Sequence, residues 1–198
     1  MSIYTTKEPL LLRGVFKKFD DTRGFLSAID LRDLELSVNC ENFHYQLLTH
    51  TNDRYTFRGF HFQEKPFEQD KLIFIHSGRL IDIVFPVNLK APNDIKIFDL
   101  FSGDALYVPK GYAHGYITVC ENVVLQYLMN NSFSTEHYTG INGKNIANLV
   151  KEDCLVSEKD LTLPQNFSIE SLLRKELNDW LAIKKVDLIA DLDNIHGS

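Results

Sequence analysis

Short apolar runs separated by turn residues fill the chain as far as residue 128. The runs are rich in β-branched and aromatic residues, which is typical of strands in a packed β-structure. The segments with this pattern are Leu10–Phe16, Gly24–Ala28, Phe43–Thr51, Thr56–Phe62, Lys71–His76, Leu80–Pro86, Ile95–Leu100, Ala105–Pro109, Ala113–Thr118 and Asn122–Leu128. Turn signals such as Ser77-Gly78 and Ser102-Gly103-Asp104 lie between them. Strands of this length and spacing predict an all-β sandwich or barrel.

A helical period replaces this pattern near the C-terminus. From Ile169 to Ala190, one face of the expected helix is apolar. This face consists of Ile169, Leu172, Leu173, Leu177, Trp180 and Leu181. We predict Ser168 as its N-cap, with Glu170 in the first turn. We also expect a short helix over Asp30–Leu36.

One domain accounts for the length and composition of the chain. It has 198 residues, of which 44% are hydrophobic, an ordinary share for a globular protein with one core. The sequence has no internal repeat, low-complexity tract or interdomain linker. We therefore predict a β-domain over residues 1–164 and a helical extension over residues 165–198 that packs on the same domain or on a partner subunit.

Charge and cysteine content exclude several classes of partner. A formal net charge of -6 argues against nucleic acid or an anionic membrane surface as the main partner. Cys40, Cys120 and Cys154 lack CxxC spacing, so neither a disulfide framework nor a zinc site is indicated, and we expect reduced core cysteines. No signal-peptide pattern and no run of ~18 apolar residues is present. We expect a cytoplasmic protein without a membrane span.

Two segments deliver a histidine into this β-pattern. The first is Arg58-Gly59-Phe60-His61-Phe62-Gln63, and the second runs from Val108 to Tyr116 and contains His114. The spacing Gly103-x5-Pro109-x-Gly111-x2-His114 fits the second cupin motif, which turns a strand so that its histidine points into the barrel. At the first motif's HxH position, Gln63 stands in place of a histidine, and Gln is a weak ligand for zinc, iron or copper. We therefore expect no metal.

Several motifs together resemble one enzyme family. Arg-Gly-x-His-x-Gln is followed in order by Lys71, Gly-Tyr-Ala-His-Gly-Tyr, Gln126-Tyr127-Leu128 and a Ser-x-x-Asp segment ending at Asp160. Over residues 10–164 the chain resembles the dTDP-4-dehydrorhamnose 3,5-epimerase family. The resemblance implies a cupin jelly-roll barrel that epimerises a nucleotide-linked 4-keto-6-deoxyhexose without a cofactor, for deoxysugar and surface polysaccharide biosynthesis. It also implies a homodimer in which an N-terminal strand, here including Leu10–Leu12, joins the partner's sheet.

The same resemblance assigns the catalytic roles. His61 matches the family's base, which removes a proton beside the ketone, and histidine as a residue type suits general-base catalysis. Asp160 matches the aspartate that fixes the imidazole tautomer and supports the imidazolium. Lys71 would stabilise the developing enolate, and Tyr127 would return a proton to the opposite face.

Each of these residues also has an ordinary structural explanation. A strand histidine such as His61 is often only a hydrogen-bonded residue, and Asp160 lies in a polar segment suited to a solvated charge or a helix cap. Lys71 opens an apolar strand and its ammonium group is able to extend to solvent, while Tyr127 fits a packed aromatic residue. The epimerase assignment therefore depends on the motifs occurring together.

The resemblance also implies a set of substrate-binding residues. Arg23 and Arg58 match family arginines, and guanidinium groups suit the oxygens of a diphosphate through paired hydrogen bonds. Gln46 and Phe133 lie near the family's positions for contact with the base. Phe25 belongs to Arg23-Gly24-Phe25, which matches an early Arg-Gly-Phe segment of the family. Gln63 and His114 belong to the two histidine motifs, and His114 has an alternative role as a structural hydrogen-bonding residue.

The chain departs from the family pattern around the substrate. Ala28 stands where the family usually has a glutamate, and Phe85–Leu89 lacks an arginine expected near the phosphates. The segment from Asn142 to Glu152 is shorter and lacks the family's tryptophan, and the tail beyond Pro164 is longer. Nucleotide, sugar and reacting carbon are therefore open. Two alternatives also remain, namely a sugar-nucleotide 3,4-ketoisomerase and a non-catalytic sugar-nucleotide-binding cupin.

Overall fold

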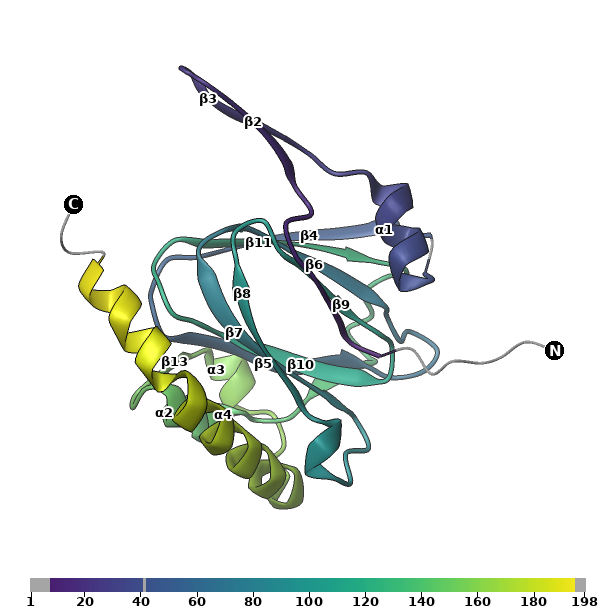
Figure 1. The fold of residues 1–198 in the computed structure, drawn as a ribbon. Helices are drawn as coiled ribbons and strands as arrows, with labels where there is room; N and C mark the ends of the chain where they lie inside the picture. The colour runs from purple at the N-terminus through teal and green to yellow at the C-terminus, as the bar shows by residue number, and fades with distance from the viewer. Residues whose placement is uncertain (1–7, 41, 195–198) are drawn as a thin grey trace.

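Two sheets form the body of the protein (Figure 1). The computed structural model describes residues 8–40 and 42–194. The five-stranded sheet has the order β1 (Leu10–Leu12), β9 (Ala105–Val108), β6 (Lys71–Ser77), β11 (Val123–Met129) and β4 (Tyr45–Thr51). The six-stranded sheet has the order β12 (Tyr138–Gly140), β5 (Thr56–Gln63), β10 (Tyr112–Thr118), β7 (Arg79–Pro86) and β8 (Lys96–Phe101), with β13 (Leu155–Val156) beside β5. Neighbouring strands are antiparallel, except that β13 runs parallel to β5.

A hairpin and several helices complete the structure. The hairpin consists of β2 (Lys17–Asp21) and β3 (Gly24–Ala28) and projects from the body (Figure 1). The helices are α1 (Leu31–Val38), the short 3-10 helix η1 (Pro92–Asp94), α2 (Lys144–Val150), α3 (Glu158–Leu161) and α4 (Phe167–Asn194). None of the helices in the described part of the chain has an apolar stretch long enough to cross a bilayer.

Strand alternation places a core between the two sheets. On β6, Ile73 and Ile75 point inward, while Leu72 and Phe74 point to the outer face. The inward residues meet those of the six-stranded sheet, such as Val84 and Tyr116. The outer face of the five-stranded sheet is covered by α1, so β6 is apolar on both faces.

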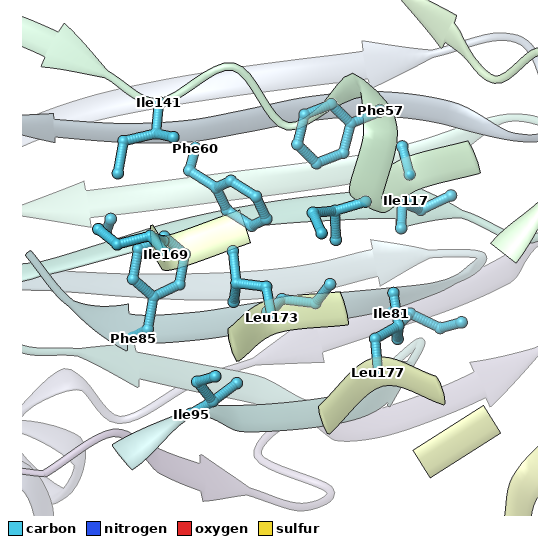
Figure 2. Close-up of a cluster of buried hydrophobic side chains, with 14 of the residues drawn as sticks. Phe57, Phe60, Ile81, Phe85, Ile95, Ile117, Ile141, Ile169, Leu173 and Leu177 are labelled. Carbon is cyan, nitrogen blue, oxygen red and sulfur yellow. The ribbon is translucent and has the colours of Figure 1, made fainter. Parts of the chain in front are cut away.

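The long helix α4 covers the outer face of the six-stranded sheet. Ile169, Leu173 and Leu177 are buried against Phe60 and Phe85 (Figure 2). Because both faces of β7 are covered, its sequence reads as a nearly continuous apolar run rather than an alternating one. The apolar helix face expected from the sequence is thus a packing surface on the same chain.

Most expected elements are present within two residues of their predicted ends, but the first strand is not. Strand β1 ends at Leu12, and Arg13 forms an ion pair with Asp104 instead of continuing the ladder. Gly14 then adopts a positive φ of 60°, which breaks the extended backbone. The chain resumes as β2, which pattern reasoning missed because its sequence is largely charged.

The predicted N-cap of the long helix is wrong. Helix α4 begins at Phe167, so Ser168 already lies inside it. Asn166 performs the capping, because its Oδ1 accepts a hydrogen bond of 3.1 Å from the backbone N–H of Ile169. Asparagine caps helices as well as serine does, so the cap lies two residues before the predicted one.

Candidate active site

A cavity of about 430 Å³ opens between the two sheets and gathers most of the predicted site residues. Its walls come from β4, β5, β6, β10 and β11, together with α3 and the segment before β12. The predicted residues that line it are Arg58, His61, Gln63, Lys71, His114, Tyr127, Phe133 and Asp160. These eight residues come from segments that are far apart along the chain.

An irregularity in β5 directs two of these side chains into the cavity. Across the β5–β10 pair, His61 is opposite His114 and Arg58 is opposite Tyr116, so β5 has one more residue between the two pairs than β10 has. In a regular strand, residues three apart point to opposite faces. The extra residue lets Arg58 and His61 face the same side.

Glycine residues permit the close approach of β5 and β10 at this irregularity. A Cβ atom on Gly59 would lie 2.3 Å from the Cα of Gly115, and Gly59 has a φ of +142°. No other residue fits both conditions without moving the strands. The glycines of the two histidine motifs therefore lie back to back, which explains why both motifs contain one.

His61 is held by Asp160. Its Nε2 lies 2.7 Å from Asp160 Oδ1, although 99 positions separate the two residues. Asp160 lies in α3, whose N-cap Ser157 accepts a hydrogen bond of 3.1 Å from the Asp160 backbone N–H. Burial opposes ionisation of Asp160, but hydrogen bonds from His61, Ser157 and the Gly59 backbone dominate and lower its pKa. The carboxylate can therefore only accept, so Nε2 carries the proton and Nδ1 has the free lone pair.

The ammonium group of Lys71 lies next to the backbone of His61. It opens β6 on the inward face, is 8% exposed, and donates from Nζ to the His61 carbonyl at 3.5 Å. Burial lowers the pKa of Lys71 to about 8, although the carboxylate of Asp82 opposes the shift. Lys71 is therefore mostly protonated at neutral pH, and its charge has little solvent around it.

Asp82 is a site residue that sequence reasoning missed. It lies on β7, is 1% exposed, and its Oδ2 is 3.2 Å from His114 Nδ1. Burial raises the pKa of Asp82 and lowers the pKa of His114, while the two groups oppose each other's shifts. The signal was present in the sequence, because a lone aspartate inside the apolar run Leu80–Phe85 needs a buried partner.

Tyr127 faces the two histidines from the other sheet. It lies on the inward face of β11, and its ring centroid is 6.1 Å from that of His114. Burial, the neighbouring Tyr116 phenol and Asp82 raise the pKa of Tyr127 well above its ordinary value. The hydroxyl therefore stays protonated and able to donate.

Aromatic side chains form one wall of the cavity. The ring of Tyr138 lies 5.2 Å from that of His61 and 5.4 Å from that of Phe133. The ammonium of Lys159 lies 4.1 Å from the Tyr138 ring centroid. Tyr138 and Lys159 were not predicted, and Tyr138 lies in a three-residue strand that carries no apolar pattern.

Three predicted site residues lie away from this cavity. On β4, Tyr45, Leu47 and Thr49 line it, so the exposed Gln46 points to the other face. Arg23 and Phe25 lie on the projecting β2–β3 hairpin (Figure 1). Arg23 is exposed there and pairs with Asp21 at the hairpin turn.

The metal expectation stays a prediction. Among residues 8–40 and 42–194, no group of three or more His, Cys, Asp or Glu side chains is arranged to hold a metal ion. Gln63, which occupies the second HxH position, has its side-chain amide hydrogen-bonded to backbone groups.

Comparison with known proteins shows matches to one family. The family model described as dTDP-4-dehydrorhamnose 3,5-epimerase matches residues 9–166. A dTDP-4-dehydrorhamnose 3,5-epimerase of Sinorhizobium fredii is 31% identical over 137 residues, which are 63% of this chain and 67% of the relative. One from Escherichia coli is 30% identical over 131 residues, covering 61% and 68% of the two chains.

Solved structures agree with the sequence comparisons. A dTDP-4-dehydrorhamnose 3,5-epimerase from Bacillus anthracis, with TDP and PPi bound, matches with a TM-score of 0.67 and 26% identity over 83% of this chain and 98% of its own. A 3'-monoepimerase from Streptomyces bikiniensis, in complex with dTDP-quinovose, shares the fold with a TM-score of 0.64 at 17% identity over 91% of this chain and 96% of its own. The chain belongs to the dTDP-4-dehydrorhamnose 3,5-epimerase family.

Proposed function

We propose that this protein epimerises a nucleotide-diphosphate-linked 4-keto-6-deoxyhexose in deoxysugar biosynthesis, without a cofactor. The observation that carries the proposal is the His61–Asp160 pair on one side of a cavity, with Tyr127 on the opposite sheet. A base and an acid on opposite sides are what inversion at a carbon requires. Family membership supports the same activity.

Proton abstraction falls to His61. Because Nε2–H donates to Asp160, Nδ1 is the nitrogen that accepts the proton from the carbon beside the C4 ketone. The Asp160 carboxylate then stabilises the imidazolium. As the C–H bond breaks, its electron pair moves toward the carbonyl and places negative charge on the C4 oxygen.

Lys71 and Tyr127 complete the cycle. The buried Lys71 cation stabilises the enolate oxygen, and its effect is large because little water screens it. Tyr127 then gives its proton to the carbon from the opposite side, which inverts the centre. The cycle closes when His61 releases its extra proton to solvent and the Tyr127 phenolate takes one up.

The nucleotide has two anchoring features in the cavity. Arg58 donates from Nε to Thr51 at 3.2 Å, which orients the guanidinium so that its terminal nitrogens serve a diphosphate. Phe133 and Tyr138 offer ring faces to a base, and stacking of this kind tolerates different bases. The identity of the nucleoside is therefore a question for binding measurements with TDP, UDP, CDP and GDP.

Solvent exchange tests the activity directly. Candidate 4-keto-6-deoxy sugar nucleotides are incubated with the protein in deuterated water, and NMR follows the signals of C3–H and C5–H. Label at both carbons supports double epimerisation, and label at one carbon supports mono-epimerisation. A 3,4-ketoisomerase moves the keto group instead, and a binding protein leaves every candidate unlabelled.

We further propose that the body is a cupin jelly roll over residues 1–164, with residues 165–198 as an extension of the same domain. The two facing sheets and the inward His114 after Gly111 support the barrel assignment. The burial of Leu173 and Leu177 against the six-stranded sheet supports the domain assignment. These residues would not be buried if the helix formed a separate unit.

The protein is proposed to act as a homodimer in the cytoplasm. On the projecting hairpin, Phe19 and Leu26 are cross-strand partners and are 59% and 68% exposed, an apolar face suited to a second copy. Arg23 on the same hairpin would then reach the partner's cavity rather than its own. Leu10–Leu12 pairs with β9 of its own sheet and forms the edge of that sheet. The three cysteines are thiols, which fits a reducing compartment.

A further inference from the structure

The side-chain amide of Gln63 is fully engaged with two loops. Its Nε2 donates to the carbonyls of Phe67 at 2.7 Å and Ser132 at 3.1 Å. Its Oε1 accepts from the backbone N–H of Ser134 at 2.7 Å. Both amide hydrogens are therefore used, and Gln63 has no donor left for a substrate although it borders the cavity.

Phe133 lies between the two residues that Gln63 holds in its loop. The amide grips the backbone on both sides of Phe133, through Ser132 and Ser134. Gln63 is also the register partner of Tyr138 across the β5–β12 pair. The side chain of Gln63, two positions from His61, thus holds the backbone on both sides of Phe133, and the backbone of Gln63 pairs with that of Tyr138.

We infer that Gln63 is a positioning residue that presets Phe133 for stacking on the nucleoside of the substrate. The inference deepens the proposed function and rests on it for the identity of the ligand. Ordering the backbone of a loop residue costs conformational entropy, which a ligand must otherwise overcome on binding. A loop that is ordered beforehand binds more tightly, and the gain appears in nucleotide affinity rather than in the chemical step.

The effect of the Gln63 hydrogen bonds on the loop is tested without any ligand. Gln63→Met keeps the length of the side chain and removes all three hydrogen bonds. Hydrogen–deuterium exchange, read by mass spectrometry on peptides that span Ser132–Ser134, is expected to accelerate at least about tenfold. Gln126→Met is the matched control, because the Gln126 side chain bonds His76 on the outer face of β11 and points away from the cavity. It should leave these peptides unchanged.

The functional consequence is tested by a double-mutant cycle with TDP as the first probe, and with UDP, CDP and GDP if another diphosphate binds better. Gln63→Met and Phe133→Leu are each expected to weaken the Kd about tenfold, the effect of one lost stacking contact. The double variant is expected to bind within about twofold of Phe133→Leu alone, because Gln63 acts through Phe133. With a turned-over substrate, KM should rise in parallel while kcat stays within about twofold.

Three results would overturn the inference. These are unchanged exchange at Ser132–Ser134 in Gln63→Met, multiplicative losses in the double variant, and a fall in kcat with KM unchanged. If no sugar nucleotide is labelled in deuterated water, the proposed activity fails, but the exchange and Kd cycles still decide the role of Gln63. Phe133→Leu alters an exposed residue, so it keeps the cycle readable even if Gln63→Met lowers stability.

Discussion

His61 and His114 are register partners on neighbouring strands, and each is held by a carboxylate of its own. Asp160 reaches His61 from a helix at the rim, whereas Asp82 holds His114 from within the core. Burial keeps His114 neutral by lowering its pKa. The two imidazoles therefore lie in different environments, which is consistent with the proposed role of His61 as the base and with a hydrogen-bonding role for His114.

Asp160→Asn is expected to reduce the rate of solvent exchange by about 100-fold or more, because the amide no longer supports the imidazolium. Nucleotide Kd should change little. Asp153→Asn, at an exposed turn, is the control. Equal rates for wild type and Asp160→Asn would contradict a role for the carboxylate.

Asp160 also predicts how stability depends on pH. Its folded pKa lies below the unfolded value, so its contribution is present above the unfolded pKa and is lost as pH falls through the folded one. Urea denaturation of wild type should therefore lose more stability below pH 4 than Asp160→Asn does. The same acid dependence in both proteins would contradict the assignment.

Lys71 predicts a basic limb in the pH–rate profile. As pH rises through about 8, Lys71 loses the charge that stabilises the enolate, so kcat/KM should fall. From this group alone, stability should rise with pH between about 8 and the ordinary value of 10.5, because there the unfolded chain binds more protons. The loss of activity is therefore not unfolding, and circular dichroism at each pH checks this. A flat profile to pH 9.5 would refute the role, and exposed Lys96→Met should keep the limb.

Tyr127→Phe separates abstraction from inversion. His61 can still remove a proton and return a deuteron to the same face, so NMR should show label in unreacted substrate. The inverted product should form at least about 100 times more slowly, because the opposite acid is gone. Tyr112→Phe, whose hydroxyl bonds Glu8 outside the cavity, should behave as wild type. Wild-type yields of inverted product from Tyr127→Phe would assign the acid to another group.

The hairpin predicts the oligomeric state. Replacing Phe19 and Leu26 with serine removes an exposed apolar pair, so sedimentation analysis should show monomers in place of dimers. Leu36→Ser, another exposed leucine, is the control. If Arg23 serves the partner's cavity, TDP affinity should fall when the dimer is lost. A dimer that survives the double substitution would place the interface elsewhere.

The helix α4 predicts a stability effect. Leu177→Ala should lower the free energy of unfolding by about 2–5 kcal/mol, because Leu177 is fully buried against the six-stranded sheet. Ile183→Ala on the same helix, where the side chain is 77% exposed, should change it by less than about 0.5 kcal/mol. Chemical denaturation measures both. Equal effects would mean that α4 does not pack in this way in solution.

Local sequence patterns predicted the strands and the helix whose apolar residues are buried. Short apolar runs between turn residues identified β4 to β11, because each of these strands buries at least one face. On the predicted apolar face of α4, Ile169, Leu173 and Leu177 are buried, and the other three residues are partly buried against the same cluster. The charged hairpin strand β2 and the short β12 were missed, because pairing with a neighbour, not an intrinsic pattern, makes them strands.

The sequence by itself determined the β-rich body, the helical tail and, through its motifs, the family and the residues proposed for catalysis. The tertiary structure decided which of these predicted residues line one cavity and which lie elsewhere. Asp160 reaches His61 across 99 positions, and Asp82 emerged as the partner of His114. Gln46 and Arg23 are absent from the cavity because strand alternation and a projecting hairpin direct them elsewhere. A motif specifies residue types. Contacts between distant residues depend on strand register and on the closure of long loops, and a local sequence pattern does not encode either of these.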